Sequence, residues 1–220
     1  MDAHAPFLQL IADAPTDPHV AHVYADWLEE TGDKARAEFI RVEYRVRALS
    51  DADPAWAPAV ARLRVLAKRL PRAWTSMFNA PSVSGYTFAG TSMNHHFVGR
   101  FLANHKLNYT QSTGSYENGT WWQTGSIVTW EMNKRYAVYT GALVGGSKLV
   151  GDAKNVARST WTFVLEHTTV PETVALPEGT NTQIYPQPRP RKKKKKAPPK
   201  KTKVATKAGS GGARATRKRA

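Results

Sequence analysis

From residue 4 to about residue 72, apolar side chains recur at the spacing of amphipathic α-helices. Asp17-Pro18, Asp33 and Asp53-Pro54 place capping acids at three helix starts, and a shorter helix is expected around Phe7. The expected apolar faces are Val20, Val23, Tyr24, Trp27 and Leu28, then Phe39, Val42, Val46 and Leu49, then Trp56, Val60, Leu63, Ala67 and Leu70. The pattern predicts a helical module at 4–72 whose helices pack against one another.

From about residue 82 to residue 167 the period changes from 3.6 to 2, which indicates strands. In Ser126–Met132 the alternation puts Val128, Trp130 and Met132 on one face of a strand. Gly145-Gly146 suits a tight hairpin between two further strands. The predicted fold class is α+β: the helical module, an antiparallel β-barrel-like meander of six to eight strands at 82–167, and a C-terminal tail.

Charge is unevenly distributed along the 220 residues, whose formal net charge is +15. Of the 32 basic residues, 15 lie between residues 186 and 220, where there is no acidic residue. The other 17 basic residues balance all 17 acidic ones, so residues 1–185 have no net charge. The chain has no cysteine, which excludes disulfides, thiolate metal sites and a catalytic thiol.

The tail at 186–220 is too poor in apolar residues to fold, so we expect it to be disordered after a linker at 168–185. Its cations neutralise phosphates whatever the base sequence, with a limiting salt slope of about −13 on duplex DNA. The candidate nucleic-acid-binding residues are Arg189, Arg191, Lys192, Lys193, Lys194, Lys195, Lys196, Lys200, Lys201, Lys203, Lys207, Arg214, Arg217, Lys218 and Arg219. DNA is favoured over RNA; anionic lipid would satisfy the same electrostatics, and a merely solubilising tail is the plain alternative.

The aromatic residues of the β segment suggest a second function. Trp121, Trp130, Trp161 and Phe163 are the candidate walls of a cavity for a small apolar ligand. Trp121 and Trp122 are adjacent in the sequence, so at most one of them faces inward. The alternative is a barrel interior filled by these rings.

Evidence for catalysis or metal binding is weaker. His19 and His22 share a helical face with Asp26, but no further ligand is evident, and His95 and His96 point to opposite faces of a strand. The β segment holds four acids, Glu117, Glu131, Asp152 and Glu166, and no known catalytic motif. We therefore predict a protein that is not an enzyme and has no metal and no cofactor.

Three segments resemble known families. Tyr24-Ala25-Asp26-Trp27-Leu28-Glu29-Glu30, Gly32-Asp33 and Ala37-Glu38-Phe39-Ile40-Arg41-Val42 resemble the bacterial repeat-companion domain over residues 6–48. That resemblance implies a bacterial protein and brings no activity with it. A docking surface for a protein partner at Trp27, Asp26, Glu29 and Glu30 is one interpretation; the alternative is that Trp27 lies in the core and the acids pair with Arg36 or Arg41. Gly119-Thr120-Trp121, Tyr136–Gly141, Gly151–Asn155 and Trp161-Thr162-Phe163 resemble small lipocalin-like or avidin-like domains over residues 84–167. The tail is similar in composition to histone-like Lys/Ala/Pro-rich tails.

No stretch of the sequence is long and apolar enough for a transmembrane helix, and the N-terminus lacks a basic signal-peptide region. These features predict a cytoplasmic protein, associated with the nucleoid if its tail binds DNA. The leading hypothesis is a non-enzymatic modular protein tethered to nucleic acid by its tail. The alternative is a barrel that binds a small apolar ligand and is localised by the tail to an anionic surface.

Overall fold

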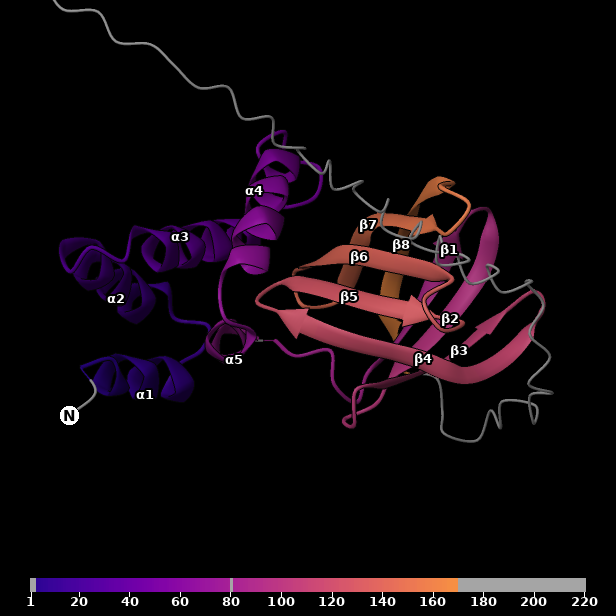
Figure 1. Ribbon diagram of the computed structural model, residues 1–220, viewed down its shortest axis with the longest axis horizontal. Coiled ribbons are helices and arrows are strands. Elements are labelled where there is room, and N and C mark those ends of the chain that lie inside the picture. Colours follow the sequence, from indigo (N-terminus) through magenta and orange to yellow (C-terminus); the bar gives the residue numbers. More distant parts are fainter. Residues whose placement is uncertain (1–2, 80, 170–220) are drawn as a thin grey trace, which may run out of the picture. The chain divides into compact units, whose positions relative to one another are not determined.

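The computed structural model describes residues 3–79 and 81–169 and confirms the predicted fold class (Figure 1). The helices are α1 (Ala5–Asp13), α2 (Pro18–Glu30), α3 (Lys34–Ala48), α4 (Trp56–Arg69) and α5 (Arg72–Thr75), followed by a 3-10 turn at Ser76–Phe78. The strands are β1 (Thr87–Ser92), β2 (His95–Phe101), β3 (Lys106–Gln111), β4 (Gly114–Thr124), β5 (Ile127–Met132), β6 (Ala137–Val144), β7 (Lys148–Asn155) and β8 (Thr160–Thr168). Every candidate nucleic-acid-binding residue from Arg189 onward lies outside the described residues, as does the linker beyond Thr169.

Two of the three predicted helix starts are confirmed. The Asp17 carboxylate accepts a hydrogen bond from the amide of His19 at 2.8 Å, and the Asp33 carboxylate accepts one from the amide of Arg36 at 3.2 Å. The third prediction is wrong by two residues, because Asp53 accepts a bond from the Ala55 amide at 2.7 Å and holds a turn before α4 begins at Trp56.

The buried face of α2 differs slightly from the predicted one. Val23 is 46% exposed, while Ala21 and Ala25 are fully buried, because small residues allow α2 and α3 to approach closely. Trp27 is partly buried against the helical core, as expected. The predicted charge pairing holds for Arg41, which contacts Asp26 at 2.7 Å and Glu29 at 2.6 Å. Arg36 instead pairs with Asp33 at 2.9 Å.

The eight strands form a closed up-and-down antiparallel barrel in which β1 pairs with β8, an arrangement consistent with lipocalin-like barrels. The predicted alternation in β5 is confirmed, and the face that carries Val128, Trp130 and Met132 is the one that points into the barrel core. Trp130 is fully buried and stacks on Tyr139, with ring centroids 5.0 Å apart and planes 10° apart. Aromatic rings therefore fill most of the barrel interior.

The helices pack against the barrel as well as against one another. Ile127, Ala142 and Val144, on the outer surface of β5 and β6, belong to the same apolar cluster as the helical core. Helices and barrel therefore lie in one compact unit, joined by an apolar contact that the sequence pattern did not predict.

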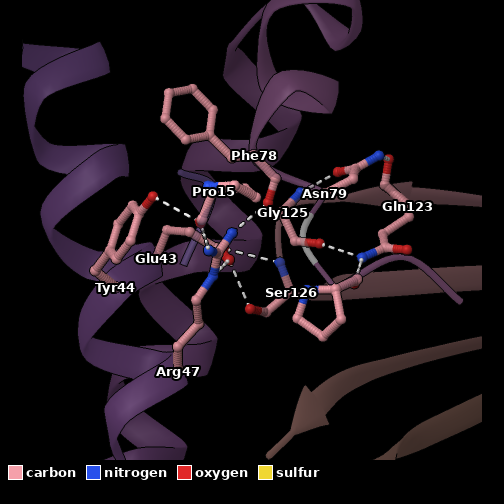
Figure 2. A network of polar contacts seen from close by, with 10 residues as sticks. Pro15, Glu43, Tyr44, Arg47, Phe78, Asn79, Gln123, Gly125 and Ser126 are labelled. Carbon is pink, nitrogen blue, oxygen red and sulfur yellow. Dashed lines mark hydrogen bonds and ion pairs between the residues drawn. The ribbon is translucent and has the colours of Figure 1, made fainter. Parts of the chain in front are cut away.

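A buried polar contact, here called the α3–barrel joint, lies beside this apolar contact and consists of Glu43, Arg47 and Ser126 (Figure 2). The fully buried Glu43 carboxylate accepts hydrogen bonds from the Ser126 amide at 2.8 Å, the Ser126 hydroxyl at 2.6 Å and Arg47 Nε at 2.8 Å. Arg47 also donates to the carbonyl oxygens of Pro15, at 2.9 Å, and Phe78. These bonds satisfy a carboxylate that would otherwise be costly to bury.

Candidate functional site

One end of the barrel holds the candidate site. The turns that connect β1 to β2, β3 to β4, β5 to β6 and β7 to β8 all lie at this end. They surround a cavity of about 210 Å³, here called the mouth cavity. Its lining residues are Ser92, Met93, His95, His96, Phe97, Gln111, Met132, Asn133, Tyr136, Ala137, Tyr139, Asn155 and Trp161.

The lining of the mouth cavity carries no aspartate, glutamate, lysine or arginine. Aromatic rings supply much of the wall, and amide, hydroxyl and imidazole groups supply hydrogen-bonding capacity. A lining of this kind offers no fixed countercharge and so disfavours a strongly charged ligand, which would lose hydration on entering.

Hydrogen bonds fix side chains on two sides of the mouth cavity. On one side, Trp161 Nε1 donates to the Ser92 hydroxyl at 3.0 Å, and Ser92 donates to the Tyr139 hydroxyl at 3.3 Å. On the other side, the side-chain oxygen of Asn133 accepts from the Tyr109 hydroxyl at 3.1 Å and from the Asn118 amide at 2.9 Å. The cavity wall is therefore oriented before any ligand arrives.

Backbone strain is concentrated at the same end of the barrel. Among the described residues, seven other than glycine have positive φ, and six of these lie in the turns around the mouth: Met93, Asn94, Asn133, Lys134, Arg135 and Arg158. At the opposite end, positive φ is mostly carried by Gly125, Gly145 and Gly146, which adopt it without steric cost. Non-glycine residues held in the left-handed backbone conformation cost free energy and tend to occur at functional sites.

The structure separates the four predicted cavity residues. Trp161 is partly exposed and lines the mouth cavity, whereas Trp130 and Phe163 are buried in the barrel core. Trp121 faces inward near the opposite end, where its indole N–H donates to the Leu102 carbonyl at 2.9 Å. Its neighbour Trp122 lies on the outer surface and is half-buried.

Sequence reasoning missed Ser92, Asn133 and Tyr139 as residues of the cavity. For Tyr139 the signal was present, because alternation along β6 places it on the same inward face as Ala137 and Leu143. Ser92 ends β1 on the same inward face as Phe88, so alternation carried a signal for it too. Asn133 lies in the turn after β5, where there is no regular alternation.

The acidic residues of the barrel do not line the mouth cavity. Glu117 and Glu166 are exposed, Glu131 pairs with Arg135 at 3.0 Å, and Asp152 pairs with Arg64. His95 and His96 are exposed at the cavity rim. Within the described ranges, no group of three or more histidine or acidic side chains is placed to hold a metal ion. Nor does any helix in this part of the chain have the length and apolar character needed to cross a membrane.

Comparison with family models finds no match for the chain, and comparisons with curated proteins and with solved structures find none either. The resemblances to the repeat-companion domain and to histone-like tails therefore stay predictions.

Proposed function

We propose that this protein is a non-enzymatic binding protein whose mouth cavity takes a small, neutral, planar molecule. The observation that carries the proposal is an aromatic-lined cavity without aspartate, glutamate, lysine or arginine, ringed by turns in strained conformations. Aromatic walls favour a flat apolar body, and the oriented side chains of Ser92, Tyr139 and Asn133 favour one with a hydrogen-bonding edge.

The size of the cavity limits the ligand class. Sites for drug-sized molecules typically span about 300–1,000 Å³, and an engineered apolar cavity of about 150 Å³ in another protein binds benzene. At about 210 Å³, the mouth cavity suits a one- or two-ring molecule. Because the rest of the barrel interior is filled by aromatic side chains, a long lipid-like ligand is not expected.

Titration of the full chain with indole and 2-naphthol, followed by thermal unfolding, tests the proposal. We expect both probes to raise the unfolding temperature and 2-naphthoate, which is charged, to have no effect. Trp161→Ala should abolish the shift, whereas Trp27→Phe, in the helical module, should leave it unchanged. Equal shifts with neutral and charged probes, or an unchanged shift in Trp161→Ala, would refute the proposal.

A second candidate function belongs to the tail, which we propose binds nucleic acid without sequence specificity. It is favoured by the segregation of the entire net charge of +15 into residues 186–220. Replacing Lys192, Lys193, Lys194, Lys195 and Lys196 with glutamine in the full chain should weaken duplex DNA binding and reduce the salt slope by about 4.5. Unchanged binding would assign the tail another role.

A further inference from the structure

The outer surface of the barrel carries a groove, here called the outer groove, that is distinct from the mouth cavity. It lies between α4–α5 and the outer surfaces of β4–β7 and encloses about 570 Å³. Its lining residues are Arg64, Ala67, Lys68, Leu70, Arg72, Trp122, Thr124, Ile127, Thr129, Glu131, Arg135, Val138, Thr140, Asp152 and Lys154.

The outer groove is cationic although residues 1–185 have no net charge. Its lining contains five basic side chains and two acidic ones. The two acids are neutralised in ion pairs, Asp152 with Arg64 and Glu131 with Arg135. No described carboxylate forms an ion pair with Lys68, Arg72 or Lys154, so three positive charges are left to attract anions.

Trp122 gives the outer groove a stacking surface. The Arg72 guanidinium lies 5.0 Å from the centre of the indole ring, and the ring is only half-buried. Trp122 and Arg72 also line a neighbouring depression of about 360 Å³, which holds Ser84 and His105. The indole therefore contributes to the walls of two recesses.

We infer that the outer groove binds single-stranded nucleic acid, with a base stacked near Trp122 and phosphates held by Lys68, Arg72 and Lys154. Cations beside a partly exposed aromatic ring are the combination that binds single strands, because unpaired bases offer a free π face. In a duplex the bases are already stacked on one another, and a polyanion without bases would gain only the charge interaction. The inference is independent of the tail, whose sequence has no aromatic residue after Tyr185 and therefore offers phosphate contacts alone.

The test is titration of the full chain with oligo(dT) and with polyphosphate of equal charge, followed by tryptophan emission and by anisotropy. Oligo(dT) should quench the emission, whereas polyphosphate should bind through the tail without quenching. Trp122→Ala should lower oligo(dT) affinity about tenfold and remove most of the quenching. Lys68→Gln with Arg72→Gln should reduce the salt slope by about 1.4, the effect of two lost phosphate contacts on a single strand.

Lys34→Gln, at the exposed start of α3, is the matched control and should leave the affinity and the quenching unchanged. Equal quenching by oligo(dT) and polyphosphate, or unchanged affinity in the Trp122 and Lys68/Arg72 variants, would overturn the inference. If the tail does not bind polyanions, the result is different: polyphosphate binding is lost while the quenching by oligo(dT) is retained. The charge variants alter only exposed side chains, so they remain informative if Trp122→Ala does not fold.

Discussion

The α3–barrel joint should be a main determinant of stability, and Glu43→Ala tests this directly. The substitution removes a fully buried carboxylate that accepts three hydrogen bonds. It leaves the Ser126 amide buried without its partner and Arg47, whose side chain is 15% exposed, without its countercharge. Both consequences are unfavourable, since removing one member of a buried ion pair leaves an uncompensated charge.

The size of the effect follows from these contacts. Breaking a buried ion pair costs about 3–5 kcal/mol, and we expect about 3 kcal/mol because Arg47 keeps two carbonyl acceptors. For a protein of this size, that loss corresponds to a fall of about 10 °C in the unfolding temperature. Glu43→Gln should cost less, about 1–2 kcal/mol, because the amide oxygen can still accept the Ser126 N–H.

Urea unfolding, monitored by far-ultraviolet circular dichroism and by tryptophan emission, measures the free energy of unfolding and reports on both the helices and the barrel. Glu38→Ala is the matched control, because it lies on the same helix and pairs with Arg62 at 2.6 Å on the surface. Such an exposed pair contributes about 0–1 kcal/mol. A cost of Glu43→Ala no larger than that of Glu38→Ala would refute the assignment of the joint as a stabilising contact.

Three further predictions concern single positions. Gly125→Ala should destabilise the protein about 2 kcal/mol more than Gly145→Ala. Both glycines have positive φ, but a Cβ at Gly125 would overlap the Glu43 carboxylate of the α3–barrel joint, whereas one at Gly145 meets nothing within 4 Å. Urea unfolding of the two variants measures the difference, and equal losses of stability would contradict the overlap. Lys134→Gly should stabilise the chain by about 1 kcal/mol in the same assay by removing a left-handed non-glycine residue, and a loss of stability would show that the side chain has a structural role. The hydrogen bond from Lys148 lowers the pKa of Asp51, so this pair stabilises the folded chain above about pH 4, and the stabilisation is lost as the pH falls further. Asp51→Asn should therefore lower the free energy of unfolding at pH 7 by about 1 kcal/mol or less and flatten the acid side of the stability–pH curve. An unchanged curve would contradict the pairing.

The sequence predicted the β elements well because each strand leaves a local signal. The final strand, β8, is found at Thr160–Thr168, at the end of the segment predicted to form strands, and the glycine pair at 145–146 does form the β6–β7 turn. Closure of the barrel is a different matter. Pairing of β1 with β8 joins residues more than 70 positions apart, and nothing in local alternation specifies that register.

The α3–barrel joint shows why the remaining contacts could not be predicted. Glu43 lies one helical turn from Phe39 and Val46, so the pattern does place it on the buried face of α3. An isolated acid at such a position is rarely buried, and it is tolerated here because its partner Ser126 comes from the turn before β5, 83 residues later. The mouth cavity is similar, because its volume depends on how closely the interior rings of Trp130 and Tyr139 pack and not on which residues are apolar.

The turn between β5 and β6 connects the two proposed binding sites, and this leads to a prediction about their coupling. Asn133 lines the mouth cavity, Arg135 lines the outer groove, and both have positive φ in the same strained turn. A mouth ligand that shifts this turn is expected to move Arg135 and its ion pair with Glu131 in the outer groove, and by linkage each ligand then alters the affinity of the other by the same factor. Titration with oligo(dT) at saturating and at zero 2-naphthol should reveal a change in oligo(dT) affinity of less than about tenfold, because the backbone strain available is about 1–2 kcal/mol per left-handed residue. Lys134→Gly, by loosening the turn, should diminish that change, and identical oligo(dT) affinities with and without 2-naphthol in the unaltered chain would show that the two sites act independently.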